Sequence, residues 1–137
     1  MTATLKIRER MSALTHTVGR DQTMSEAAHR MHEFSIRHLA VLHGGTMIGI
    51  VSDRDIALVE SLPGVDASVV QVHEAMTPDP YSVTVDAPLA GVVQTMADHK
   101  YGAALVVDKG DLVGIFTTTD ALRLAHDLLA EAGAPAA

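Results

Sequence analysis

Two short motifs in this sequence carry side chains that could bind a nucleotide. Each has a hydroxyl residue followed three positions later by an aspartate: Ser52 with Asp55, and Thr117 with Asp120. At the start of a helix, free backbone N–H groups and the positive end of the helix dipole favour a phosphate, and the hydroxyl adds a neutral donor. The carboxylate repels phosphate but can accept both hydrogen bonds of a ribose diol, as in dinucleotide-binding folds. Together these groups suit a nucleotide.

The same motifs have a simpler interpretation as helix caps. Ser52 and Thr117 are favourable N-cap residues, and the two aspartates would complete ordinary capping boxes. For one isolated motif this interpretation is the stronger one. In this chain, however, both motifs follow a Gly-Ile pair at the end of an apolar stretch, which favours a shared role.

The motifs recur because the chain repeats itself at an offset of 65 residues. Residues 49–55, Gly-Ile-Val-Ser-Asp-Arg-Asp, return as residues 114–120, Gly-Ile-Phe-Thr-Thr-Thr-Asp. A repeat of this length exceeds the roughly 20 to 50 residues of solenoid arrays, and two copies are too few for one. We therefore expect two copies of a small α/β (α+β) unit in one globule, residues 7–65 and 72–130.

Each copy is predicted to contain the same elements around its motif. A capping box from Thr23 to Glu26 opens the first helix, and Pro88 opens its counterpart. Each helix leads into two apolar runs joined by a hairpin turn, Gly44-Gly45 or Lys109-Gly110. The predicted strands span 39–42, 47–51, 104–107 and 112–116, and the helices after them span 53–60 and 119–130.

An extended stretch before the first helix completes the order βαββα in each copy, at residues 17–18 and 82–83. One copy has too small a core to be secure alone. We therefore expect the two copies to pack sheet to sheet as one pseudo-symmetric module.

Composition excludes several classes of function. The formal charge of −7 argues against nucleic acid, which needs a basic surface. No cysteine is present, so disulfides, thiolate catalysis and cysteine-based zinc sites are excluded. No apolar run reaches the roughly 18 residues that span a bilayer, and the charged N-terminal stretch does not suit a signal peptide. We expect a cytoplasmic protein with neither nucleic acid nor membrane as partner.

At this point the sequence resembles the cystathionine-β-synthase (CBS) domain family, specifically the tandem pair called a Bateman module. Besides the two Gly-Ile motifs, the resemblance is carried by two opening motifs, Ile7-x-x-x-Met11-Ser12 and Val72-x-x-x-Met76-Thr77-Pro78. It covers nearly the whole chain. It implies a sensor that binds adenosine-containing molecules in clefts between the two copies and that often forms flat homodimers.

The resemblance also implies which residues form the clefts. Each cleft joins the strand-to-helix turn of one copy to the first strand of the other. In the first cleft Asp120 would bind ribose, Thr117 and Thr119 phosphate, and Arg37 and His38 would neutralise it. The residues of this cleft would be Ile36, Arg37, His38, Ile115, Thr117, Thr119 and Asp120. Arg37-His38 can also be a solvated strand start.

The second cleft is predicted to differ in charge. Asp55 would bind ribose, Ser52 and Arg54 phosphate, and Tyr101 would lie against the base or fill a gap between copies. Its residues would be Ile50, Ser52, Arg54, Asp55, Tyr101, Gly102 and Ala103. Arg37, His38 and Arg54 favour AMP or ATP as the ligand, with S-adenosylmethionine and NAD as alternatives. No cofactor is expected besides this regulatory ligand.

We expect no catalysis, because no third group orients the hydroxyls and aspartates. His29 and His32 have a spacing that can hold a metal, but without a clear third ligand no metal site is expected. The favoured function is a stand-alone regulatory module whose nucleotide binding is transmitted to an unknown protein partner. The alternative is a ligand-independent structural or dimerisation module, in which the helix from residue 121 to 129 could form the dimer surface.

Overall fold

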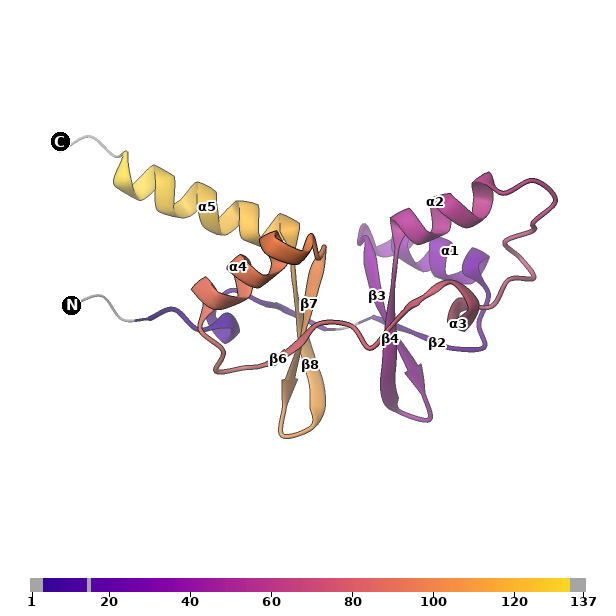
Figure 1. Ribbon diagram of the computed structural model, residues 1–137, viewed down its shortest axis with the longest axis horizontal. Coiled ribbons are helices and arrows are strands. Elements are labelled where there is room, and N and C mark those ends of the chain that lie inside the picture. Colours follow the sequence, from indigo (N-terminus) through magenta and orange to yellow (C-terminus); the bar gives the residue numbers. More distant parts are fainter. Residues whose placement is uncertain (1–3, 15, 134–137) are drawn as a thin grey trace. The chain divides into compact units, whose positions relative to one another are not determined.

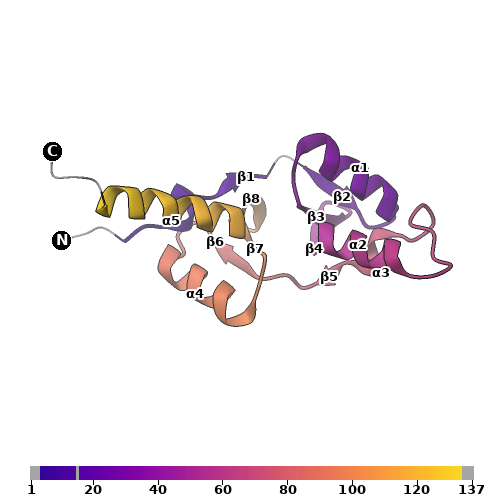
Figure 2. The same cartoon turned by 90° about the horizontal axis from the view of Figure 1, so that it is seen from above.

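The computed structural model describes residues 4–14 and 16–133, and the chain divides into two compact units (Figures 1 and 2). The continuous unit is Thr15–Pro80, and the split unit combines Met1–Leu14 with Tyr81–Ala137. Each unit contains one four-stranded sheet, and five α-helices lie in the described part of the chain. None of these helices is long and apolar enough to span a membrane. The mixed α/β fold predicted from the repeat is confirmed.

The continuous unit has the strand order β2-β3-β4-β5, with β2 parallel to β3 and the other neighbours antiparallel. Its sheet carries helices whose apolar residues share one buried cluster with the strands. The elements are β2 Thr17–Gly19, α1 Met24–Phe34, β3 His38–His43, β4 Thr46–Ser52, α2 Asp53–Ser61, α3 Val72–Ala75 and β5 Thr77–Pro78.

The split unit repeats this arrangement with the order β1-β8-β7-β6, in which β6 and β7 are parallel. Its core contains Phe116 of β8 and Leu124 of α5, together with apolar residues of α4 and β7. The elements are the 3-10 turn η1 Ile7–Glu9, β1 Ser12–Ala13, β6 Ser82–Thr84, α4 Leu89–His99, β7 Ala103–Asp108, β8 Asp111–Thr117 and α5 Thr118–Ala132.

The hairpin turns form where the sequence predicted them. Both residues of each turn have positive φ angles, 57° and 82° at Gly44 and Gly45, and 52° and 86° at Lys109 and Gly110. Two successive positive φ angles match the twist of a tight antiparallel hairpin. The order βαββα is therefore confirmed in both repeats, with helix and strand ends within a few residues of the prediction.

The predicted capping box of α1 forms only in part. The Thr23 side chain accepts a hydrogen bond from the Glu26 backbone N–H at 3.1 Å, as a cap should. The Glu26 carboxylate, however, accepts a hydrogen bond from the Gln22 side chain at 3.0 Å and does not reach back to Thr23. Gln22 is a competing donor nearby, which the spacing of Thr23 and Glu26 alone does not reveal.

Each compact unit takes its opening motif from the other repeat. Ile7 is fully buried in the core of the split unit, and its backbone N–H donates to the Ala87 carbonyl at 2.9 Å. Val72 is likewise fully buried in the continuous unit. In Figure 1 the indigo N-terminal segment accordingly accompanies the orange and yellow elements of the second repeat. The opening motifs therefore complete the cores.

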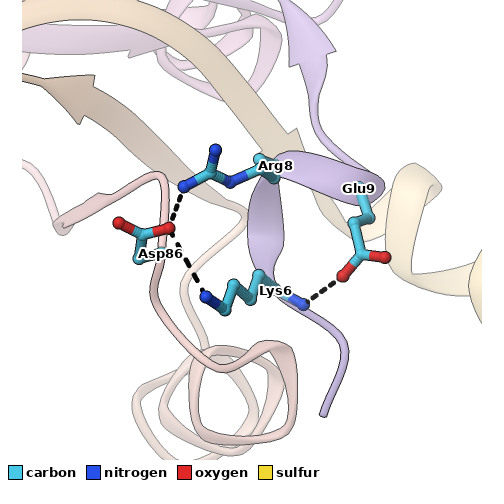
Figure 3. A network of polar contacts seen from close by, with 4 residues as sticks. All are labelled: Lys6, Arg8, Glu9 and Asp86. Atoms are coloured by element: carbon cyan, nitrogen blue, oxygen red, sulfur yellow. Dashed lines mark hydrogen bonds and ion pairs between the residues drawn. The ribbon is translucent and has the colours of Figure 1, made fainter. Parts of the chain in front are cut away.

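Polar contacts hold the first opening motif in place (Figure 3). The carboxylate of Asp86, in the loop before α4, pairs with the side chains of both Arg8 and Lys6. The Lys6 backbone N–H donates to the Glu9 carboxylate at 2.7 Å. Since all these side chains are exposed, the ion pairs add little free energy and serve mainly to fix the path of the segment.

The Gly of each Gly-Ile pair permits the close approach of an opening motif. A Cβ on Gly49 would lie 2.5 Å from Met76 Sδ and 2.8 Å from the Thr77 carbonyl oxygen. A Cβ on Gly114 would lie 2.5 Å from Met11 Sδ and 3.0 Å from the Ser12 carbonyl oxygen. Only a residue without a side chain fits there, which explains why glycine stands at both positions.

Candidate functional site

The two hydroxyl–aspartate turns have nearly the same geometry. Asp55 Oδ2 accepts hydrogen bonds from the Ser52 backbone N–H at 2.8 Å and from Ser52 Oγ at 3.0 Å. Asp120 Oδ2 accepts the same pair from Thr117, at 2.9 Å and 3.1 Å. The hydroxyl oxygens in turn accept from the aspartate N–H groups, so both capping boxes are complete. The helix-cap interpretation is therefore confirmed for the local structure.

Capping does not use the whole carboxylate. In both turns the cap engages only Oδ2, which leaves Oδ1 available to another partner. Asp120 Oδ1 accepts a hydrogen bond from Ser12 Oγ at 3.2 Å, and Asp120 is only 9% exposed. For Asp55 Oδ1 there is no corresponding bond in the described part of the chain, and this residue is half-buried. A cap and a ligand acceptor are thus compatible in one residue.

Within the continuous unit, the start of β3 lies beside the turn that begins α2. His38 is the strand partner of Ser52, and the Asp53 backbone N–H donates to the Arg37 carbonyl at 2.9 Å. The Arg37 side chain lies 4.0 Å from the Asp53 carboxylate, and both side chains are exposed. Arg37 therefore remains open to solvent, in agreement with a solvated strand start as well as with a phosphate contact.

The split unit has the equivalent arrangement at the start of β7. Ala103 is the strand partner of Thr117, and the Thr118 backbone N–H donates to the Gly102 carbonyl at 3.1 Å. The structure thus brings each strand start together with the turn of its own unit. The predicted clefts join each turn to the strand start of the other repeat, and that pairing stays a prediction.

The remaining predicted residues occupy strand ends and first helical turns. Ile50 and Ile115 are half-buried and are the strand partners of Thr77 and Ser12, respectively. Ile36 packs against the core of the continuous unit. The exposed residues Arg54 and Thr119 lie in the first turns of α2 and α5, where side chains can reach a ligand at the helix start.

Burial lowers the pKa of His38 below its ordinary value of 6.5. Asp53 and Asp55 oppose this shift, whereas Arg37 and Arg54 reinforce it. The imidazole is therefore neutral at pH 7 in the free protein. Of the cations predicted from the sequence, Arg37 and Arg54 carry permanent charge, and His38 gains one only where an added anion favours its protonated form.

Tyr101 belongs to a group of stacked rings that the sequence prediction missed. Its ring centroid lies 5.4 Å from that of Tyr81 and 5.1 Å from that of His99. In the continuous unit His16 and Phe34 stack with centroids 3.6 Å apart. The offset of 65 residues pairs His16 with Tyr81 and Phe34 with His99, so the repeat itself held the signal. Because Tyr101 already has two ring neighbours, a base would have to share its surface with them.

No metal site emerges from the histidines of α1. His29 contacts Glu33 at 3.7 Å, and its side chain is 80% exposed. In residues 4–14 and 16–133, no group of three or more histidine, aspartate or glutamate side chains is arranged to hold a metal ion.

Comparison with known proteins identifies the family. The family model of the CBS domain matches residues 8–61 and 71–127, and the chain therefore belongs to the CBS domain family as a tandem pair. The CBS domain-containing protein YhcV of Bacillus subtilis is 32% identical over 114 residues, which cover 83% of this chain and 81% of YhcV.

Two similar solved structures contain adenosine compounds. The structure of CBSX2 in complex with AMP is 25% identical, with a TM-score of 0.78, and the comparison covers 90% of this chain and 97% of that one. The CBS domain pair of protein MJ0100, in complex with 5′-methylthioadenosine and S-adenosyl-L-methionine, is also 25% identical. Its TM-score is 0.79, with coverage of 88% of this chain and 99% of that one.

Proposed function

We propose that this protein is a regulatory module that binds an adenosine-containing ligand, preferably AMP or ATP, in clefts between its two CBS repeats. The observation that carries the proposal is the duplicated turn in which a capped aspartate keeps Oδ1 outside the cap, next to a hydroxyl at a helix start. The AMP complex of the similar protein CBSX2 supports an adenine nucleotide as the ligand.

In the proposed second cleft Asp55 accepts the ribose hydroxyls, because Oδ1 remains free of the cap. Ser52 and Arg54 bind the phosphate at the positive end of α2. Gly102 and Ala103 add backbone at the start of β7, and Tyr101 faces the base together with its stacked neighbours.

In the proposed first cleft Asp120 binds the ribose and Thr117 with Thr119 the phosphate. Arg37 supplies a permanent positive charge, and His38 becomes charged as the phosphate approaches. This cleft gains more positive charge on binding than the second one, which suits ATP better than a nucleoside without phosphate.

Ligand binding can regulate only if it favours one arrangement of the protein over another. We propose that nucleotide binding changes the packing of the repeats or of two protomers in a homodimer, and that a protein partner detects the change. The proposal assigns the protein no catalytic residue, and it places the protein in the cytoplasm, where adenine nucleotides are plentiful.

The alternative function is a ligand-independent dimerisation module. It is favoured by the complete capping boxes and by the exposed apolar side chains of α5, Leu122 and Leu129, which are both 71% exposed. In that case the aspartates would contribute only to helix capping.

Thermal unfolding against AMP, ATP, S-adenosylmethionine and NAD separates the two functions. A ligand that binds only the native state adds about 2.7 kcal/mol at 100 times its Kd, which raises the Tm by several degrees. We expect such a shift with AMP or ATP, reduced by Asp55→Ala or Asp120→Ala. If no compound shifts the Tm of the folded protein, the dimerisation module is the better description.

Thr23→Ala is the matched control for these variants. It removes an N-cap side chain of the same kind, which costs about 1 kcal/mol, from a helix outside the proposed clefts. We expect it to lower the Tm without changing the shift caused by the ligand. Equal loss of the ligand shift in Thr23→Ala would mean that the aspartate variants act through stability and not through contact.

A further inference from the structure

The two aspartate turns differ in the hydrogen bonds that their carboxylates can still accept. An ionised carboxylate has about four acceptor positions, two on each oxygen. Asp55 uses two of them, both on Oδ2, for the cap. Asp120 uses the same two and a third on Oδ1, which accepts from Ser12 Oγ. Asp55 thus keeps two positions on one oxygen, and Asp120 keeps one.

The difference arises from a side chain and not from the backbone. Ser12 is the strand partner of Ile115 in β1–β8, and Thr77 is the equivalent partner of Ile50 in β4–β5. Both residues are exposed and occupy the same place in their units, 65 residues apart. In the described residues, however, only the Ser12 hydroxyl bonds to an aspartate of the turn.

A ribose diol donates two hydrogen bonds, so it needs two acceptor positions. Asp55 can supply both, whereas Asp120 can supply both only after the Ser12 hydroxyl turns away. We propose that Ser12 competes with a ribose hydroxyl for Asp120 and thereby weakens nucleotide binding at this turn relative to the Asp55 turn. The proposal rests on the proposed function, because it takes the aspartates as ribose acceptors.

The length of the Ser12 bond fits a competitor that a ligand can displace. Its oxygen–oxygen distance of 3.2 Å exceeds the usual range of about 2.5 to 3.0 Å for hydroxyl donors. A bond this long is weak, so Ser12 lowers the affinity without closing the site. The two turns of one chain can then respond to different nucleotide concentrations.

Calorimetric titration with AMP and 2′-deoxy-AMP tests the proposal. In an Asp55→Ala background, which leaves the Asp120 turn, Ser12→Ala should tighten AMP binding by roughly 2- to 10-fold, the value of one hydrogen bond. Binding of 2′-deoxy-AMP should not change, because its single remaining hydroxyl fits the position already free. Ser12→Thr keeps the hydroxyl and should bind AMP as the parent does.

Thr77→Ala in an Asp120→Ala background is the matched control, and it should leave AMP binding unchanged. Unchanged or weaker AMP binding after Ser12→Ala would overturn the role of Ser12 while AMP binding by the unmodified protein stands. Absence of AMP binding in both Asp55→Ala proteins would also overturn it. If the unmodified protein binds neither AMP nor ATP, the proposed function fails, and the role of Ser12 fails with it.

Discussion

His38 shows how a strand start can carry a titratable group that is neutral in the free protein. Its half-buried ring lies beside the turn that begins α2, where two carboxylates and two guanidinium groups act on it in opposite directions. Burial outweighs the carboxylates and lowers the pKa. The residue type predicted a cation, and only the environment shows that its charge depends on the conditions.

We predict that His38 makes the stability of the protein depend on pH. Since its pKa is lower in the folded state, the unfolded chain binds more protons once the pH falls below about 6.5. The His38 contribution is therefore complete above this pH and is lost as the pH falls towards the folded-state pKa. Urea unfolding at about pH 5.5 and pH 7.5 should give a smaller difference for His38→Gln than for the unmodified protein. Equal differences would contradict the prediction.

At the residue scale, the members of the candidate site could be predicted only where their chemistry is local. Ser52 with Asp55 and Thr117 with Asp120 lie three residues apart, so their contact follows from helix geometry. The bond from Ser12 to Asp120 joins residues 108 positions apart, and no local pattern indicates it. The ring stack around Tyr101 was missed for the same reason.

At the scale of elements, the opening motifs dock on the sheets through glycine. β5 approaches Gly49 of β4 so closely that its Met76 sulfur and Thr77 carbonyl occupy the space of a side chain. β1 approaches Gly114 of β8 in the same manner. The strands, hairpins and helices themselves were predictable, because turn residues and apolar periodicity specify them locally. The sequence pattern does not specify which sheet each opening motif joins, because both copies offer the same glycine.

Gly49→Ala is predicted to destabilise the protein by about 1 to 3 kcal/mol, because the backbone of β5 must move away from the new methyl group. Gly91→Ala is the control: this exposed glycine lies within α4 with open space around it. That change should stabilise the protein by roughly 0.5 to 1 kcal/mol. Chemical unfolding of both variants measures the two effects. A loss of stability in Gly91→Ala equal to that in Gly49→Ala would show that the close approach of β5 is not the cause.

At the scale of the whole molecule, each repeat depends on a segment of the other. Ile7 and Val72 occupy equivalent positions in the two opening motifs, and both are fully buried. Each lies in the core of the unit that contains most of the opposite repeat. The stability of one repeat should therefore respond to changes in the other.

Ile7→Ala is predicted to remove about 2 to 5 kcal/mol from the split unit. Amide hydrogen exchange should show reduced protection in β7 and β8, although the substituted residue belongs to the first repeat. Val72→Ala, the matched variant, should reduce protection in β3 and β4 instead. If Ile7→Ala deprotected β3 and β4 as strongly as β7 and β8, the assignment of the opening motif to the split unit would be wrong.

The exchanged opening motif also sets an order of events on the ribosome. Residues 15–80 emerge as one continuous stretch and can complete their core early. Ile7 leaves the ribosome before them but finds its partners, such as Phe116 and Leu124, only after more than a hundred further residues have been added. At translation rates of about 5 to 20 residues per second, this apolar side chain waits on the order of ten seconds. The N-terminal segment of each nascent chain is therefore a binding site for chaperones until its own C-terminal helix has been made.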